Sequence, residues 1–209
     1  MWFAKVMPLL LLVSCSAPVS YRYELVVEVD TPQGPRTGSG VIEVTVRPEP
    51  KPLPDMTGRD VRIRGEAVAI DLPGGQTLFA TLNGENSGGY AGSIAVQSLA
   101  PGRRTPEEAE AGLSVPGQEA PVPRQSYPLL VRFRDIRDPR TVEGVDPDNL
   151  SAAFGPAVRL KSIRIRTTRA EPTFVLQGRL PWLGSNFQAY PRASNGVEIG
   201  TSSLSFQRR

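Results

Sequence analysis

The sequence predicts a mainly β protein, an antiparallel sandwich or open barrel with two short helices. Three observations favour this fold class. Apolar and polar residues alternate over short runs, which is the period of a half-buried strand. Glycine (20) and proline (21) are frequent and separate these runs, as turn residues do. Helix-start signals stand out at only two places. A chain of 209 residues is long enough for one domain with a buried core.

The first two predicted strands form a hairpin. In residues 21–30 and again in residues 39–47, the apolar side chains fall on one face. The turn between them, residues 31–36, contains two prolines and a glycine and favours a short connection. The expected core residues of this hairpin are Tyr21, Tyr23, Leu25, Val27, Val29, Ile42, Val44 and Val46. Residues 48–58 are rich in proline, which cannot donate to a β ladder, so we expect a surface crossover there.

Residues 60–72 contain two apolar phases that do not share a face. The phases consist of Val61 and Ile63, then of Val68, Ile70 and Leu72. The shift at Gly65 and Glu66 predicts a β-bulge, because one extra residue reverses the facing of a strand. Residues 73–75, Pro-Gly-Gly, then indicate a tight turn. Residues 76–82 return as the second strand of this hairpin.

Two short helices carry clear start signals. The first is capped by Thr105, has Pro106 at its first helical position and a glutamate three residues after the cap, and ends near Gly112. The second occupies residues 146–155, where an aspartate caps the helix, a proline opens it and a glycine closes it.

Between residues 83 and 126 regular patterning otherwise fades. The glycine-rich residues 84–93 lack the Gly-Lys-Ser/Thr sequence of a phosphate cradle, so they predict a flexible loop. Because irregular loops often carry binding function, region 83–126 is the expected contact surface of the domain.

The later strands are fewer and weaker. Residues 127–134 predict a strand with Leu129, Val131 and Phe133 inward. Residues 157–168 predict a long strand with a phase change near Lys161 and Ser162. Weaker strand candidates occupy residues 173–176, 197–200 and 203–206.

The amino-terminal residues have the layout of a secretory signal. Lys5 precedes an apolar stretch from Val6 to Val13 that is too short to span a bilayer. The next residues resemble the bacterial lipobox, which ends in cysteine, over Leu12-Val13-Ser14-Cys15. The resemblance implies cleavage between Ser14 and Cys15, a diacylglyceryl group on the sulfur and often an acylated amino group. The alternatives are an ordinary cleaved signal with an incidental cysteine, and a buried amino-terminal helix.

The lipobox sets the expected domain organisation. Residues 1–14 are a lipoprotein signal peptide, residues 15–20 a tether and residues 21–183 a single β-rich domain. Residues 184–209 form a C-terminal extension that either stands outside this domain or belongs to it. Ser16 lacks the acidic character that retains lipoproteins at the inner membrane in well-studied envelope systems, so the outer membrane is favoured over the inner membrane.

Composition excludes several chemistries. The chain has no histidine, which removes Ser-His-Asp triads, histidine-ligated metals and imidazole acid-base catalysis. Its one cysteine forms no intramolecular disulfide, and acylation would remove its thiol. No basic stripe interleaves with aromatic residues, so no nucleic-acid partner is expected. No cofactor, metal site or catalytic residue is expected from any motif.

The densest acidic stretch leaves one enzymatic alternative. It comprises Asp135, Asp138, Glu143, Asp146 and Asp148. Such carboxylates act as paired acid and base in hydrolysis or transfer, or bind Ca²⁺. Helix capping explains the last two aspartates equally well, because carboxylates favour the helix amino terminus.

A basic cluster suggests a partner. It comprises Arg159, Lys161, Arg164 and Arg166, with Arg132 and Arg134. Guanidinium groups on one surface would bind phospholipid or lipopolysaccharide headgroups. A solvated strand face is the plain alternative.

Six segments resemble a family of uncharacterised proteobacterial envelope lipoproteins. These are Tyr21-Arg-Tyr-Glu-Leu, Gly65-Glu-Ala-Val-Ala-Ile-Asp-Leu, Tyr127-Pro-Leu-Leu-Val-Arg-Phe, Val145-Asp-Pro-Asp-Asn-Leu, Ala153-Phe-Gly-Pro-Ala-Val-Arg-Leu and Arg179-Leu-Pro-Trp-Leu. The similarity covers about residues 21–183 and implies no activity. The sequence therefore predicts a lipid-anchored cell-envelope protein, a non-enzymatic binding or structural module. Its expected partners are the membrane, through Cys15, and an envelope protein or glycolipid. The alternative is an envelope hydrolase or transferase with a carboxylate site between Asp135 and Asp148.

Overall fold

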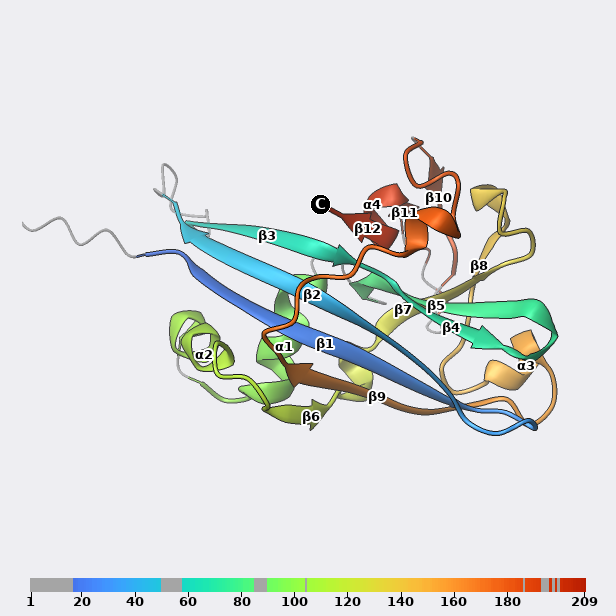
Figure 1. Cartoon of the computed structure of the whole chain (residues 1–209), viewed down its shortest axis with the longest axis horizontal. Coiled ribbons are helices and arrows are strands. Elements are labelled where there is room, and N and C mark those ends of the chain that lie inside the picture. The colour runs from blue at the N-terminus through green and yellow to red at the C-terminus, as the bar shows by residue number, and fades with distance from the viewer. Residues whose placement is uncertain are drawn as a thin grey trace, which may run out of the picture.

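Two antiparallel sheets account for most of the fold in a computed structural model (Figure 1). It describes residues 17–49, 58–84, 90–103, 105–185, 187–192, 196, 198 and 200–209. The larger sheet has the order β12 (Gln207–Arg208), β3 (Arg59–Glu66), β2 (Arg36–Pro48), β1 (Val19–Asp30), β9 (Arg159–Thr167) and β6 (Glu119–Pro121). The smaller has the order β4 (Val68–Leu72), β5 (Gln76–Gly84), β7 (Pro128–Phe133) and β8 (Val142–Gly144). The predicted fold class, a mainly β antiparallel sandwich, is confirmed.

The β1–β2 hairpin forms as predicted. Tyr21 pairs with Val44 and Tyr23 with Ile42, and all eight predicted core residues of this hairpin are buried. Their alternation places polar side chains on the other face. There Glu43 forms ion pairs with Arg22 at 2.6 Å and with Arg64 at 3.2 Å. β2 pairs directly with β3 in antiparallel register, so residues 49–58 join neighbouring strands and make no crossover. Residues 50–57 of this connection lie outside the described part of the chain.

The phase shift at Gly65 and Glu66 marks a change of sheet, so the predicted bulge is wrong. β3 ends at Glu66 in the larger sheet, and β4 begins at Val68 in the smaller one. The facing reverses because the chain passes from one layer to the other. The β4–β5 hairpin forms as predicted around Pro73–Gly75, with Leu72 opposite Gln76.

Four α-helices occur among the described residues, whereas two were predicted: α1 (Tyr90–Leu99), α2 (Pro106–Leu113), α3 (Leu150–Phe154) and α4 (Ser203–Phe206). In α2 the Thr105 hydroxyl accepts from the Glu108 N–H at 3.2 Å, as expected of the cap. α3 begins three residues later than its Asp-Pro signal suggested and ends at Phe154, before Gly155, whose φ of 98° suits glycine.

The predictions for the later strands are partly correct. β7 and β9 form, and the register of β1 with β9 shifts so that Ser162 pairs with Glu28 and Leu160 with Val29. This shift is the phase change expected near Lys161. Residues 173–175 are not a strand and residues 203–206 form α4. In the candidate at 197–200, Val197 and Ile199 lie outside the described residues.

The smaller sheet is buried on both faces. Its inner face packs against the larger sheet and α1 in a first core. Its outer face packs against the C-terminal residues in a second core, with Phe206 fully buried and its ring 5.3 Å from that of Trp182. The outer-face residues of the smaller sheet in the second core are Ala69, Phe79, Leu129, Val131, Phe133 and Val142. Hence β7 is apolar at consecutive positions, as strands covered on both faces are.

The segment after β9, residues 168–176, crosses the outer face of the larger sheet before it reaches the second core (Figure 1). Thr173 accepts from the N–H of Val41 at 3.4 Å. Glu66 is only 2% exposed. Its carboxylate accepts hydrogen bonds from the N–H groups of Val175 at 2.7 Å and Leu176 at 2.9 Å. The buried carboxylate thus fixes where the segment turns inward, because it satisfies two amide groups at once.

Candidate functional site

The predicted lipidation and cleavage residues, Cys15 and Ser14, lie outside the described part of the chain, which begins at Ala17. Acylation of Cys15 therefore stays a prediction. Within the described residues, no helix is long and apolar enough to cross a membrane.

The first two aspartates of the acidic stretch serve their own turns. Asp135 accepts from the backbone N–H of Arg137 at 2.9 Å. Asp138 caps a short 3₁₀ turn, where it accepts from the Arg140 N–H at 3.0 Å. Hydrogen bonds from Arg140 lower the pKa of Asp138, so this carboxylate is held as a charged cap.

The remaining acids of the stretch are also occupied. Asp146 accepts from the N–H of Asp148 at 2.9 Å, and Asp148 pairs with Arg124 at 2.8 Å. Glu143 pairs with Arg132 of β7 and with Arg134, which follows that strand. The described residues contain no group of three or more side chains able to hold a metal ion. The structure therefore does not bring these carboxylates together into one site.

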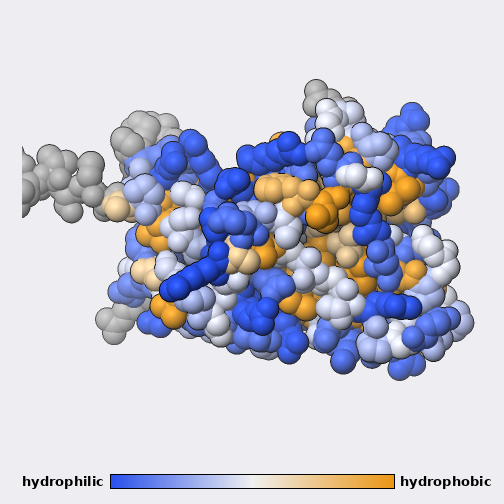
Figure 2. Space-filling model, in the orientation of Figure 1, coloured by the Kyte–Doolittle hydropathy of each residue, from blue (hydrophilic) through white to orange (hydrophobic). Residues whose placement is uncertain are grey.

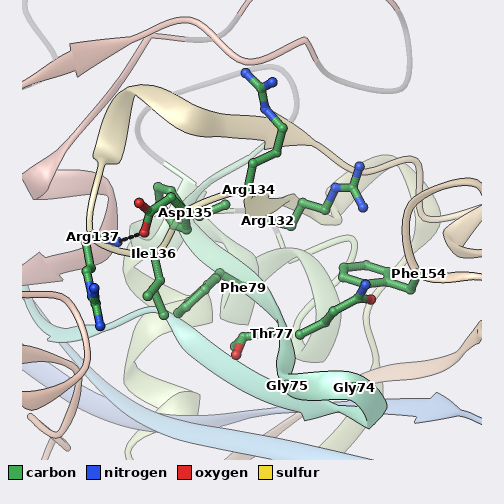
Figure 3. A pocket seen from close by; sticks show the side chains of 12 residues that line it. Gly74, Gly75, Thr77, Phe79, Arg132, Arg134, Asp135, Ile136, Arg137 and Phe154 are labelled. Atoms are coloured by element: carbon green, nitrogen blue, oxygen red, sulfur yellow. Dashed lines mark hydrogen bonds between the residues drawn. The ribbon is translucent and has the colours of Figure 1, made fainter.

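A hollow of about 760 Å³ lies beside Asp135, between the end of β7 and the β4–β5 turn (Figure 3). Arg132, Arg134 and Arg137 line it. Figure 3 shows their side chains pointing in three different directions, with Arg132 beside Phe154 at 5.8 Å from guanidinium carbon to ring centre. Arg132 and Arg134 both pair with Glu143 at 2.9 Å. These cations do not converge on one ligand position.

The predicted basic cluster is also divided. Arg159, Lys161, Arg164 and Arg166 are on β9 in the larger sheet, whereas Arg132 is on β7 in the smaller one and Arg134 follows directly after β7. On β9, ion pairs join Lys161 to Glu28 at 3.9 Å, Arg164 to Glu119 at 3.2 Å and Arg166 to Glu24 at 2.6 Å. Opposite charges on neighbouring strands explain most of this face as a solvated ladder.

A different hollow combines apolar walls with converging polar groups. Its volume is about 400 Å³, and β3, α1, the start of α2 and β12 surround it. We call it the tether-end hollow. The lining residues are Arg59, Val61, Ile63, Gly92, Ser93, Val96, Pro106, Glu110 and Arg208. Pockets of this size and mixed lining are typical of small-molecule sites.

The polar part of the tether-end hollow is an ion pair between Arg59 and Glu110. The Glu110 side chain is only 7% exposed, and Arg59 is its charge partner away from water. Beneath them Tyr21 donates to the carbonyl of Gly92 at 3.1 Å. Burial raises the pKa of Tyr21, the nearby Glu110 raises it further, and Arg59 partly opposes both effects. Tyr21 is therefore a neutral hydrogen-bond donor that fixes α1 against β1.

Arg208 completes the polar part. Its Nε donates to the carbonyl of Leu204 at 3.0 Å. Burial lowers the pKa of its guanidinium, because partial removal from water disfavours the charged form.

Sequence reasoning missed α1, which forms one wall of this hollow, because glycines between residues 84 and 93 suggested a loop. The buried residues of α1 are Tyr90, Ala91, Ile94, Ala95 and Ser98. Their spacing is helical, so the periodicity of residues 90–98 was the available signal. Helices α1 and α2 of region 83–126 border the hollow, and the role of this region as a contact surface stays a prediction.

No family model, no curated protein and no solved structure matches the chain. The site must therefore be interpreted from its own geometry.

Proposed function

We propose that this chain is a lipid-anchored cell-envelope protein and that its β domain is a non-enzymatic binding module. The observation that carries the binding role is the tether-end hollow, where an apolar wall meets the Arg59–Glu110 ion pair. The anchor rests on Cys15 at the end of the Leu12-Val13-Ser14-Cys15 pattern. Two or three acyl chains would hold the protein stably, because each buried methylene contributes about 0.8 kcal/mol.

The position of the hollow supports this pairing of anchor and binding module. Val19, at the start of β1, pairs with Val46, and Val46 pairs with Val61 in the hollow. Val61 therefore lies two strands from Val19, roughly 10 Å away. Val19 follows Cys15 by four positions, which span at most about 14 Å. With acyl chains on Cys15, the hollow would be held close to the membrane surface.

Two further features favour a non-catalytic role. The chain lacks histidine, and acylation of Cys15 would remove its thiol. The acids between Asp135 and Asp148 are used in turns and ion pairs. We place the protein in the outer membrane in preference to the inner one, on the strength of Ser16.

The anchor is tested by growing cells with radiolabelled palmitate. We expect label on the wild-type protein and none on Cys15→Ala. Label retained by the variant, or absent from the wild type, would overturn the anchor. Crosslinking in intact cells, followed by identification of the trapped molecule, tests the binding role.

A further inference from the structure

The wall of the tether-end hollow leaves apolar surface open to solvent. Val61 is 46% exposed although it lies on a strand. It belongs to β3, which pairs with β12 only at Gly65 and Glu66. Beside Val61, Gly92 of α1 lies so close that an added Cβ there would be only 3.0 Å from the valine side chain. Glycine at this position thus lets α1 approach β3 along the wall of the hollow.

The polar groups stand where a ligand's head would meet this wall. Arg59 precedes Val61 by two positions, so both side chains are on the same face of β3. Arg208 comes from β12, next to β3. Guanidinium groups bind carboxylate and phosphate through paired hydrogen bonds. Two arginines and one glutamate line the hollow, so its lining carries an excess of positive charge.

The surface around the hollow fits a ligand taken from a membrane. Figure 2 shows hydrophobic residues among hydrophilic ones at the left-hand end, where β1 begins. Val115, after α2, is 60% exposed, and its neighbour Ser114 donates to the carbonyl of Ser20 on β1 at 3.5 Å. Apolar side chains therefore lie on both sides of the point where the chain enters the domain.

We propose that the tether-end hollow binds a single-chain anionic amphiphile, with its alkyl chain along Val61, Ile63 and Val96 and its head group at Arg59 and Arg208. A volume of about 400 Å³ is at the low end for small-molecule sites and suits one chain better than a diacyl lipid. This inference rests on the proposed anchor at Cys15 only in one respect, which is that the anchor would hold the hollow next to the membrane. The glyceride on Cys15 is uncharged and is not this ligand.

The test uses full-length protein purified from cells and reconstituted in phosphatidylcholine vesicles. The probe is palmitic acid carrying a photoactivatable diazirine, and mass spectrometry locates the crosslinks. We expect crosslinks on β3 and α1, and competition by unlabelled palmitate. Crosslinks spread over the surface, or none on these elements, would overturn the proposal. A diazirine-bearing monoacylglycerol tests the head group, and equal labelling by this neutral probe would overturn the anionic assignment.

Two variants with matched controls sharpen the test. Gly92→Leu forces a side chain between α1 and Val61 and so distorts the wall of the hollow, whereas Gly112→Leu places the same side chain on α2, where an added Cβ meets nothing within 4 Å. Val61→Glu puts a charge on the apolar wall, whereas Val175→Glu changes a more exposed valine elsewhere. We expect labelling to fall about tenfold in the first member of each pair and to persist in the second. Circular dichroism confirms folding, and full labelling of a folded Gly92→Leu or Val61→Glu protein contradicts the proposal.

The palmitate experiment on Cys15 keeps the two proposals separate. Loss of metabolic label on the wild type would remove the anchor, whatever the photoprobe does. Labelled Cys15 together with an unlabelled hollow would retain the anchor and remove the ligand.

Discussion

Two tyrosines in the first core differ in one hydrogen bond. The hydroxyl of Tyr23 donates to the carbonyl of Ala91 at 2.7 Å. The hydroxyl of Tyr90 is buried and has no hydrogen-bond partner among the described residues. A satisfied buried hydroxyl contributes a net stabilisation, whereas an unsatisfied one carries only its cost of removal from water. The same chemical group therefore has opposite consequences at the two positions.

We expect Tyr23→Phe to lower the free energy of unfolding by about 1 kcal/mol, because the Ala91 contact is lost. Tyr90→Phe should leave this free energy unchanged or raise it slightly, since it removes a hydroxyl with no partner. Urea unfolding followed by circular dichroism measures both. Equal losses in the two variants would contradict the assignment.

Buried phenols also predict a loss of stability in alkali. Burial raises the pKa of Tyr21, Tyr23 and Tyr90 above the ordinary value, which is about 10. Because the folded state holds these protons more tightly than the unfolded state, their contribution is complete below about pH 10 and is lost above it. We expect the free energy of unfolding to fall steeply from about pH 10 upward. Tyr21→Phe should make this fall less steep, because one of the three phenols is removed. A free energy of unfolding of the wild-type protein that does not change with pH above 10 would contradict the prediction.

At the scale of elements, the two sheets meet closely at Gly38 of β2. A Cβ added there would collide with the carbonyl oxygen of Ala69 on β4. We expect Gly38→Ala to lower the free energy of unfolding by about 2 kcal/mol, because overpacking forces the strands apart. Ser39→Ala, at the exposed neighbouring position, should change it little. Thermal unfolding compares the two, and a stable Gly38→Ala protein would show that the sheets move apart freely.

Periodicity predicted the elements whose burial is one-sided. The β1–β2 hairpin alternates cleanly, and its core residues are where the sequence placed them. Ser203–Phe206 has a buried Phe206 beside an exposed Leu204, and so short a run does not distinguish a strand from a helical turn. The change of sheet after Glu66 resembled a bulge because both reverse the facing of side chains. The hollow could not be predicted from the sequence, because it forms where α1 packs near β3, and these elements are far apart in the chain.

At the scale of the whole molecule, the smaller sheet joins the two cores. Leu130 of β7 belongs to the first core, and its neighbours Leu129 and Val131 belong to the second. A change in this strand therefore reaches both layers. Such sharing favours one cooperative unfolding transition.

Tryptophan emission tests this cooperativity. The chain has two tryptophans, Trp2 and Trp182. Cleavage before Cys15 would remove Trp2 and leave Trp182 of the second core as the only one, and Trp2→Phe gives the same result in an uncleaved protein. We expect the emission of Trp182 and the far-ultraviolet circular dichroism to change at the same urea concentration. Phe206→Ala should move both midpoints together to lower urea, because it leaves a cavity that costs about 3–5 kcal/mol. An emission change at lower urea than the dichroism change would show that the C-terminal layer opens separately.

The position of Phe206 also sets an order of events during synthesis. Asn83 donates to Ser205 across 122 positions at 2.8 Å, and Phe206 packs on the ring of Phe79. A nascent chain that has emerged only as far as Trp182 would have all of β1 to β9 but would lack Phe206, which packs on the rings of Phe79 and Phe133 in the smaller sheet. Partly folded chains that expose hydrophobic surface aggregate or recruit chaperones. The domain can complete folding only after residue 206 emerges.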